Sequence, residues 1–430
     1  MKFSRLKPEI TYYLLSAFSA MFNSIMFVTL IYFYYTVVKL NPLQLVLVGT
    51  ALESSVLILE IPTGMIADTF SRRLSVILGM MVLGLSFFFV SMARSFELVL
   101  FLQVVSGLGY TLLSGATDAW LADEVGEKQL GPIYLRAGQI ERLAALLGIG
   151  LSALLSNVAV DLPLRTGGIL YFLLGGFLIL FMPESGFKPA VSTTGAAKGL
   201  TTMLTAFREG VSTMRSRPIL MTLVVVNFFI GAASEGFDRL KDAHLVENFT
   251  FPALGEVQPV VWFSLLSLAA SLFSLLTIEI FRRRLEHISQ DPGSMPKVLL
   301  ILNTISAASV VILGLAGNFP LAVACLLLRS AVNALLEPLY TTWLVQNSAS
   351  RVRATLISMT GQTNALGQIL GGPGVGWIGS AISLRSAIVT TGLLLTPISA
   401  VYSWAIRSKY LIGPAFIPKK PGAQTDSENA

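Results

Sequence analysis

Long apolar runs, separated by short polar or basic segments, follow one another along the whole chain. Their lengths are near or above the ~20 residues that an α-helix needs to cross the hydrocarbon core of a bilayer, and the longer ones fit tilted helices. The pattern therefore predicts an all-α membrane protein with twelve transmembrane helices. We place these spans at 10–37, 43–66, 75–93, 97–122, 133–159, 164–182, 217–246, 258–281, 296–316, 319–346, 354–381 and 385–407.

Composition supports this reading and argues against several other classes of protein. The 430 residues are 54% hydrophobic and 13% charged, whereas soluble domains carry about 25% charged residues. The single cysteine excludes an intrachain disulfide, and with only two histidines we expect no metal site and no cofactor. No combination of nucleophile and base is apparent, so we predict that the protein is not an enzyme.

The basic residues predict the orientation in the membrane. Most of the 30 lysines and arginines fall in loops on one side of the predicted spans. The loops on the other side carry only Lys39, Arg94, Arg165 and Arg385. Under the positive-inside rule the basic side and both termini are cytoplasmic. The net charge of +6 then reflects topology and contact with membrane lipids, and we expect no nucleic-acid partner.

An internal repeat predicts two similar halves. Trp120-Leu121 recurs as Trp343-Leu344 and Gly138-Gln139 as Gly361-Gln362, both at an offset of 223 residues. Two parallel halves of this kind place a substrate site near the membrane midplane between them. We expect these two tryptophans and Trp262 to be anchors at the membrane interface. The predicted segments are a first half at 1–182, a linker with an amphipathic surface helix at 183–216, a second half at 217–411 and a disordered tail at 412–430.

Polar residues inside two spans suggest a central cavity. Polar and charged groups in a bilayer usually face protein or a water-filled space, because exposure to lipid is costly. The span 97–122 and the span 319–346 each carry such residues three or four positions apart, hence on one helix face, and the offset of 223 superposes the two faces. Asn227 in the span 217–246 is added to these two faces. The residues that we expect to line a cavity for a small-molecule substrate are Gln103, Tyr110, Ser114, Asn227, Arg329, Asn333 and Glu337. Packing between helices is the alternative explanation.

Carboxylates inside the spans are candidates for coupling transport to protons. We consider Glu53, Asp118, Glu141, Glu235 and Asp238. Glu235 can form a charged row with Arg239 and Asp242, because these residues are four and seven positions apart on a helix. Such a row is compatible with a solvated outer face, with an outer gate or with a proton-linked cluster. Arg142 is a candidate partner for Asp118.

The segment Gly64-Met-Ile-Ala-Asp68-Thr-Phe-Ser-Arg72-Arg73 joins the second and third spans. Its pattern of glycine, aspartate and paired arginines resembles the loop signature of the major facilitator superfamily of secondary transporters. The resemblance implies twelve helices in two pseudo-symmetric six-helix halves. It also implies a conformational latch, in which Asp68 pairs with Arg72 or Arg73 and caps the start of the span 354–381 in the outward-facing state. Candidates to accept the other arginine are Asp123 and Glu124.

Further segments, including Glu60-Ile-Pro-Thr-Gly64 and Ser234-Glu-Gly-Phe-Asp238-Arg239, are similar to a bacterial branch of drug exporters labelled tetracycline-resistance-like. This likeness implies a monomer in the bacterial inner membrane that exports hydrophobic or amphipathic small molecules in exchange for protons. Gln103 departs from the pattern, because drug–proton antiporters often have an arginine there. The alternative is uptake or facilitated transport of a nutrient, metabolite or lipid, and Arg329 would suit an anionic or zwitterionic one.

Overall fold

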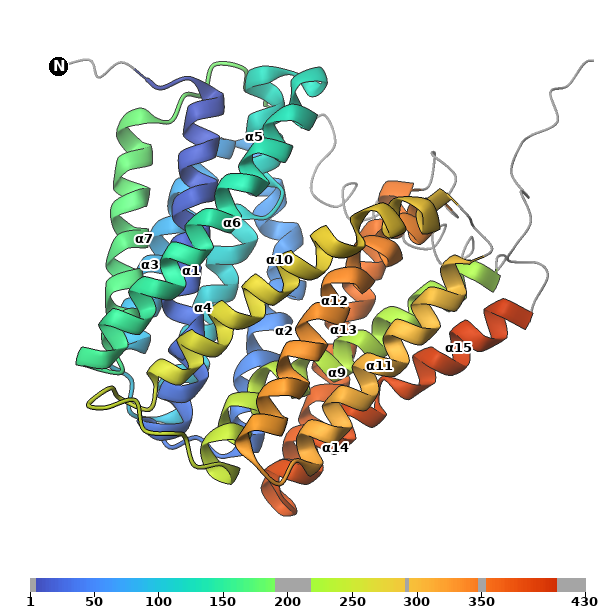
Figure 1. The fold of residues 1–430 in the computed structure, drawn as a ribbon. Helices are drawn as coiled ribbons and strands as arrows, with labels where there is room; N and C mark the ends of the chain where they lie inside the picture. Colours follow the sequence, from blue (N-terminus) through green and yellow to red (C-terminus); the bar gives the residue numbers. More distant parts are fainter. Residues whose placement is uncertain (1–4, 190–217, 291–293, 347–352, 408–430) are drawn as a thin grey trace, which may run out of the picture.

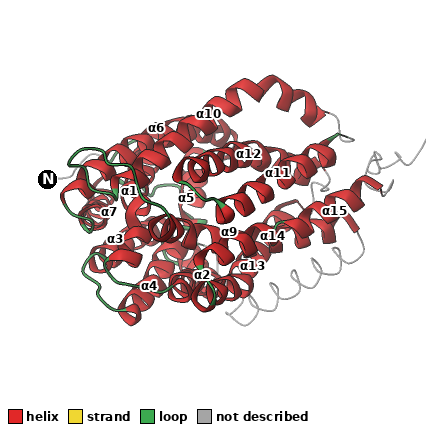
Figure 2. Ribbon diagram, turned by 60° about the horizontal axis from the view of Figure 1, so that its bottom comes forward, coloured by secondary structure: helices red, strands yellow, loops and turns green. Residues whose placement is uncertain are grey.

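The computed structural model describes residues 5–189, 218–290, 294–346 and 353–407, and within these ranges every regular element is a helix (Figure 2). The first part of the chain forms α1 (Pro8–Thr36), α2 (Pro42–Thr69), α3 (Arg72–Val90), α4 (Phe96–Leu113), α5 (Ala116–Val125), α6 (Glu127–Val158) and α7 (Leu162–Phe181). The second part forms α9 (Pro218–Asn248), α10 (Val261–Gln290), α11 (Met295–Leu315), α12 (Phe319–Gln346), α13 (Arg353–Ala381), α14 (Leu384–Leu393) and α15 (Thr396–Arg407).

The helices account for the predicted membrane spans. In the described ranges, 11 helical segments are long and apolar enough to cross a membrane, with α4–α5 and α14–α15 each forming one of them. The remaining span is α13, which has 29 residues and contains several glycines and amide side chains. It packs against α9 and α2 inside the bundle. The prediction of a twelve-helix membrane protein is therefore confirmed.

Several helices begin at residues that satisfy the free backbone N–H groups of a first turn. The side chain of Asn41 accepts a hydrogen bond from Gln44 N, the Gln44 side chain accepts one from Asn41 N, and Pro42 occupies the first helical position of α2. Ser71 and Ser95 cap α3 and α4 in the same way through their hydroxyls. These local signals define where each span begins.

The span predicted as continuous at 97–122 is broken. Helix α4 ends at Leu113, Gly115 has a φ of 70°, and α5 begins at Ala116. A positive φ favours glycine, because a Cβ would be strained in that conformation. The break changes the direction of the backbone, so Ser114 and Asp118 do not continue the helix face that carries Gln103 and Tyr110.

The two halves have the same internal packing. In the first half, α1 packs on α6, α3 on α4 and α7, and α2 on α4; in the second half, α9 packs on α13, α11 on α12 and α14, and α10 on α12. Contacts between the halves also come in equivalent pairs, α2 with α13 and α6 with α10. Figure 1 shows the two bundles side by side, with α10 crossing toward the first one.

The tryptophans of the repeat belong to the protein core. Trp120 and Trp343 are each only 1% exposed. The Trp120 indole N–H donates to Pro183 O at 2.7 Å, and the Trp343 ring lies edge-on to Tyr402 with centroids 5.8 Å apart. The prediction that they are anchors at the lipid interface is wrong, because each side chain is enclosed by helices of its own half.

The halves meet at the end of the bundle that the charge distribution predicts to be outside the cell, which we call the outer end. Here the Tyr35 hydroxyl donates to Glu247 at 2.5 Å, Leu43 N donates to the Ser380 hydroxyl at 2.8 Å, and Gln258 N donates to the Asn157 side chain at 2.9 Å. Toward the opposite, predicted cytoplasmic end the two bundles diverge (Figure 1). The described residues therefore form a conformation that is closed at the outer end.

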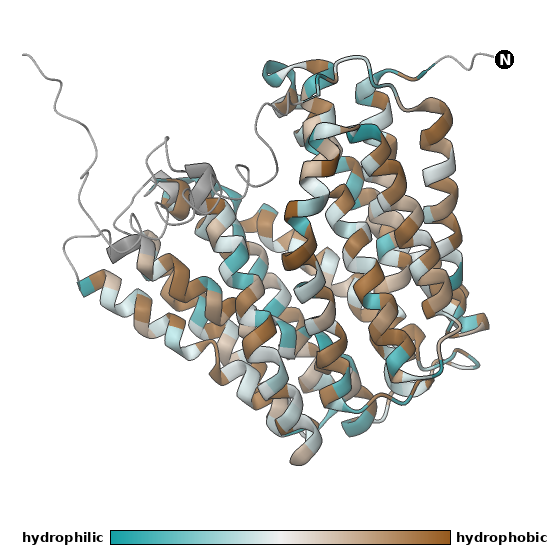
Figure 3. Cartoon of the chain, turned by 180° about the vertical axis from the view of Figure 1, so that it is seen from behind, coloured by the Kyte–Doolittle hydropathy of each residue, from teal (hydrophilic) through white to brown (hydrophobic). Residues whose placement is uncertain are grey.

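The surface of the helices suits a lipid environment. Figure 3 shows hydrophobic residues along most of the length of the helices. Large apolar side chains such as Leu143, Leu154 and Ile280 are well exposed, as expected for groups that contact acyl chains. The predicted amphipathic linker helix and the tail at 412–430 lie outside the described residues, and the predicted boundaries of the halves remain predictions.

Glycines allow two helices of the first half to touch through their backbones. A Cβ built on Gly168 of α7 would lie 2.5 Å from Phe88 N and 2.7 Å from Gly84 O of α3. The equivalent helices of the second half use the same device, since a Cβ on Gly392 of α14 would lie 2.8 Å from Val311 N of α11. Small residues at such crossings let transmembrane helices pack closely.

We predict that Gly168→Ala destabilises the first half by about 1–3 kcal/mol, because the added methyl group meets backbone atoms that can move only with their helix. The apparent melting temperature of the purified protein in detergent should fall. Gly176→Ala is the matched control on the same helix, because no atom lies within 4 Å of its would-be Cβ. Equal melting temperatures for the two variants would contradict the proposed backbone contact.

Candidate functional site

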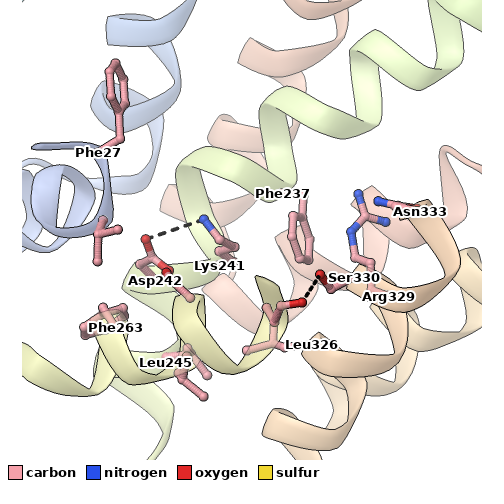
Figure 4. A pocket seen from close by; sticks show the side chains of 14 residues that line it. Phe27, Phe237, Lys241, Asp242, Leu245, Phe263, Leu326, Arg329, Ser330 and Asn333 are labelled. Atoms are coloured by element: carbon pink, nitrogen blue, oxygen red, sulfur yellow. Dashed lines mark hydrogen bonds and ion pairs between the residues drawn. The ribbon is translucent and has the colours of Figure 1, made fainter. Parts of the chain in front are cut away.

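A cavity of about 280 Å³ lies between the two halves. Its walls come from α1 of the first half and from α9, α10 and α12 of the second (Figure 4). The polar side chains in the wall are Lys241, Asp242, Ser267, Arg329, Ser330 and Asn333, and the aromatic ones are Phe27, Phe237 and Phe263. The cavity thus combines charged groups with aromatic surface, which is the usual composition of a small-molecule site.

A second cavity of about 540 Å³ adjoins the first and shares Phe27, Val28 and Ser267 with it. It is lined by residues of α1, α4, α6 and α10, including Asn23 and Tyr110. Since helices of both halves line each cavity, relative movement of the halves would change the shape of both.

Arg329 is the central cation of the first cavity. Its guanidinium carbon lies 4.0 Å from the centroid of the Phe237 ring, a favourable cation–π distance. Its Nη1 donates to the Ser306 hydroxyl at 3.2 Å, and that hydroxyl donates to Asn333 Oδ1 at 3.2 Å. Arg329 is thereby held in one orientation by α9 and α11, on the opposite side of Phe237 from Lys241 (Figure 4).

Lys241 and Asp242 form an ion pair in the same wall. The two charged atoms are 3.5 Å apart, and the Lys241 ammonium also lies 5.9 Å from the Phe237 ring centroid. Of the charged residues that line the cavity, two are cations and one is a carboxylate. Because Asp242 pairs with Lys241, the guanidinium of Arg329 is the charge that the lining residues leave without a carboxylate partner.

A second charged group occupies the other face of α9. Glu235 Oε1 and Arg239 Nε are 3.1 Å apart, and their side chains are only 3% and 13% exposed. A Cβ on Gly49 of α2 would collide with both side chains, and a Cβ on Gly372 of α13 would lie 2.8 Å from Glu235 Cγ. The ion pair is therefore enclosed between one helix from each half, at positions where both helices lack a side chain.

Residues of the first half extend this ion pair into a polar cluster. Glu53 of α2 and Tyr34 of α1 are close enough to Arg239 to interact with it electrostatically. Gln103 Nε2 donates to the Tyr34 hydroxyl at 2.8 Å. We call Tyr34, Glu53, Gln103, Glu235 and Arg239 the junction cluster, because it joins the two halves through buried polar groups.

The loop segment 64–73 comprises the end of α2, Phe70 and Ser71, and the start of α3, and it lies at the predicted cytoplasmic end. Arg72 of α3 pairs with Asp68 of α2 at 3.2 Å and with Asp123 of α5 at 2.5 Å. Arg73 donates to Ile179 O at 2.6 Å. The Asp68 side chain is 57% exposed. In this conformation the loop is thus tied to helices of its own half.

The segment after α7 is attached to the same end by two glutamates. Glu184 accepts hydrogen bonds from the Ser71 hydroxyl at 2.7 Å and from Arg73 N at 2.9 Å. Glu124 accepts from Ser185 N at 2.5 Å and from Gly186 N at 2.6 Å. Of the two candidates to accept an arginine, Asp123 pairs with Arg72, whereas Glu124 binds this segment and forms no ion pair with an arginine among the described residues.

The predicted cavity residues fall into three groups. Arg329, Asn333 and Tyr110 line the two cavities. Gln103 is 2% exposed and belongs to the junction cluster, whereas Asn227 bonds to Tyr340 between α9 and α12. The remaining two residues are exposed and outside the walls of both cavities: Ser114 and Glu337.

The candidate carboxylates are likewise separated by the structure. Glu53 and Glu235 are in the junction cluster, and Asp238 is exposed one turn from Glu235 on α9. Asp118 and Glu141 lie close enough to Tyr12 to interact with it electrostatically, toward the opposite end of the bundle. Arg142 is exposed, and among the described residues no ion pair joins it to Asp118. That pairing is absent from this conformation.

Sequence reasoning missed the aromatic residues of the cavity. The chain contains 26 phenylalanines, so nothing in the sequence distinguishes Phe27, Phe237 and Phe263 from those that pack in the core. It also missed Gly49 and Tyr34, whose roles depend on contacts between distant helices. Two signals in the sequence point to the junction cluster: the spacing of four residues between Glu235 and Arg239, and the position of Glu53 and Gln103 inside apolar spans.

Two six-helix bundles that enclose a polar cavity, with buried charges where they meet, define a membrane transporter. The profile of the Major Facilitator Superfamily matches residues 13–372 of the chain. The chain therefore belongs to this superfamily, and its function is transport and not enzymatic catalysis.

Relatives and solved structures agree with that assignment. The chain is 24% identical to the uncharacterised MFS-type transporter YxaM of Bacillus subtilis (strain 168) over 361 residues, which cover 83% of this chain and 86% of the relative. Its fold is similar to that of the nucleoside transporter NupG, with a TM-score of 0.73, 13% identity, and coverage of 94% of this chain and 100% of that chain.

Two further structures show the same fold. One is a bacterial homologue of the human lysosomal transporter Spinster in an inward-facing and occupied conformation, with a TM-score of 0.69, 15% identity, and coverage of 95% of this chain and 98% of that chain. The other is the peptide transporter POT in complex with sulfate, with a TM-score of 0.73, 14% identity, and coverage of 96% and 98%.

We predict that Gly49→Ala and Gly372→Ala shift the protein away from the outer-closed conformation, because a methyl group at either position meets the Glu235–Arg239 pair. Gly374→Ala is the matched control on α13, since no atom lies within 4 Å of its would-be Cβ. Spin labels at the exposed outer-end positions 97 and 382, in a background with Cys325→Ser, would report the distance across the outer end. A distance distribution unchanged from that of the parent protein would contradict the prediction.

Proposed function

We propose that this protein is a proton-coupled secondary transporter that exports amphipathic small molecules from the bacterial cytoplasm by alternating access. The observation that carries the proposal is the double role of α9. One face of this helix supplies Phe237 and Lys241 to the cavity, and the other supplies Glu235 and Arg239 to the junction between α2 and α13. Asp242, two turns after Glu235 on that second face, also lines the cavity. A substrate in the cavity and a proton at the junction would therefore act on the same helix.

The junction cluster suits the coupling role because its environment depends on the conformation. In the outer-closed state the Glu235–Arg239 pair is buried between Gly49 and Gly372. Opening the outer end separates α2 from α13, and this exposes the pair to external water. A proton on Glu235 would remove its negative charge and weaken its interaction with Arg239. Breaking one partner of a buried ion pair typically costs about 3–5 kcal/mol, enough to change a conformational equilibrium.

The proton gradient supplies sufficient free energy for export. Moving one charge through 100 mV corresponds to about 2.3 kcal/mol, which supports roughly fifty-fold accumulation of a substrate. One titrating carboxylate per cycle is therefore enough, and Glu53 or Glu235 is the candidate we favour because both lie where the halves separate.

The loop at 64–73 would act as a latch in the other conformation. In the outer-closed state Asp68 is exposed, while Arg72, Asp123 and the glutamates that bind the segment after α7 hold the first half together. When the cytoplasmic ends close, Asp68 would cap the start of α13 and stabilise the outward-facing state. Gly64 has no neighbour within 4 Å of its would-be Cβ in the outer-closed state, and its lack of a side chain would leave room for that approach.

The second candidate is transport of a polar metabolite in the opposite direction. It is favoured by the charged wall of the cavity and by the names of the solved structures of similar fold, which include a nucleoside transporter and a peptide transporter. Proteoliposomes would distinguish the two directions. Export predicts that an inward proton gradient drives substrate out of right-side-out vesicles, whereas uptake predicts accumulation inside them.

We predict that Glu235→Gln abolishes gradient-driven transport and preserves exchange of substrate across the membrane without a gradient. The amide keeps the shape of the side chain and a hydrogen bond to Arg239, but it does not bind and release the proton. Glu256→Gln, in an exposed loop, is the matched control and should transport as the parent protein does. Gradient-driven transport by Glu235→Gln would show that this residue is not the coupling group. Transport by the parent protein that does not depend on the pH gradient would refute proton coupling altogether.

We predict that Asp68→Asn slows the transport cycle at least about tenfold, because a lost charge-assisted contact of about 1.5–3 kcal/mol raises the barrier between the two states. The affinity for substrate in detergent should stay unchanged, since Asp68 does not line either cavity. Exchange rates in proteoliposomes and binding by calorimetry would check both statements. A large loss of affinity in a folded variant would count against the latch.

A further inference from the structure

The charge balance of the first cavity points to the class of substrate that it accepts. A guanidinium has five N–H donors, and among the described residues the hydrogen bond from Arg329 goes to the Ser306 hydroxyl alone. The other donors of Arg329 face a cavity inside a membrane protein, where an uncompensated charge is costly. An anionic group on the substrate would supply the missing partner.

The carboxylates near Arg329 do not supply that partner. Asp242 lies 3.5 Å from the Lys241 ammonium. Asp238 interacts electrostatically with Arg329, but it is exposed, does not line the cavity, and forms no ion pair with Arg329 within 4.0 Å among the described residues. The guanidinium carbon of Arg329 also lies over the Phe237 ring, 4.0 Å from its centroid, and this contact holds the cation without using its N–H donors.

The remaining surface of the cavity is apolar and aromatic. Phe27 of α1 and Phe263 of α10 line the wall across from Arg329, as Figure 4 shows. Asn333 lies beside Arg329 and is exposed, so its amide N–H₂ can donate to the same ligand group. A molecule that fits both surfaces has an acidic group at one end and an aromatic or alkyl body at the other.

We propose that the cavity selects amphipathic organic anions, with a carboxylate or similar acidic group on Arg329 and Asn333 and an apolar body against Phe27 and Phe263. This inference rests on the proposed function, because it assigns the substrate class of the same cavity. It distinguishes the protein from an exporter of amphipathic cations, whose cavity would need an unpaired carboxylate where this chain has Arg329.

The test compares three probes with the same ring and different charge: 1-naphthaleneacetate, 1-naphthaleneacetamide and 2-(1-naphthyl)ethylamine. The full-length protein is placed in phosphatidylcholine nanodiscs, which contain no anionic lipid, and binding is measured by calorimetry. We expect the acid to bind at least about tenfold more tightly than the amide or the amine, as a charge-assisted bidentate contact would give. Equal or tighter binding of the amine, or no binding of the acid, would overturn the proposal.

Variants locate the preference at Arg329. Arg329→Gln should remove the advantage of the acid over the amide, and Arg329→Lys should retain part of it. Arg142→Gln is the matched control, because this arginine is exposed and lies outside both cavities. Should Arg329→Gln fail to fold, Asn333→Asp tests the same idea at an exposed position: it should weaken the acid about tenfold or more and favour the amine. If Arg329→Gln or Asn333→Asp folds and still binds the acid as much more tightly than the amide as the parent protein does, the assignment is overturned.

The outcome is independent of the test for transport. If proteoliposomes export the ethylamine under a proton gradient, the proposed function stands and the anion proposal fails. If the acid binds through Arg329 but no probe moves under any gradient, the site assignment stands and active transport fails.

Discussion

The buried ion pair between Glu235 and Arg239 is the interaction on which the arrangement of the halves depends. A membrane interior offers no water to these charges, so each must be satisfied by the other and by nearby polar groups. The pair fits only because Gly49 and Gly372 leave space for it on α2 and α13. The outer end therefore closes around a charged group, and in the proposed mechanism opening it gives that group new partners or a proton.

This constraint explains why α9 is central to the fold. It packs on α13 within its own half and on α1 and α2 of the other half. Its side chains alternate between the junction and the cavity, so a small rotation or shift of α9 changes both sites at once. In the proposed mechanism, substrate and proton need no direct contact, because each would bias the position of the same helix.

The sequence predicts the helices well and the site only in part. Hydropathy identifies the spans because every backbone group in a bilayer must be satisfied within its own helix, which makes the signal local. The sequence points to Arg329 and Asn333 because polar residues in a span rarely face lipid. It does not indicate the kink at Gly115, the contact of Arg329 with Phe237 or the enclosure of Glu235 by Gly49. Each depends on contacts between distant residues or on one backbone angle, and hydrophobic periodicity carries no information about either.

The two arginines between the halves show how similar residues acquire different roles. Arg239 has Glu235 four residues away on the same helix, so its charge is compensated within the protein in this conformation. Arg329 has a phenylalanine ring and a serine hydroxyl in place of a carboxylate. A cation–π contact of about 0.5–2 kcal/mol orients the guanidinium and leaves its charge available. Arg239 is therefore suited to hold the halves together, and Arg329 is suited to attract a ligand. This difference comes from the partners that the fold places beside each arginine, and the residue type alone does not predict it.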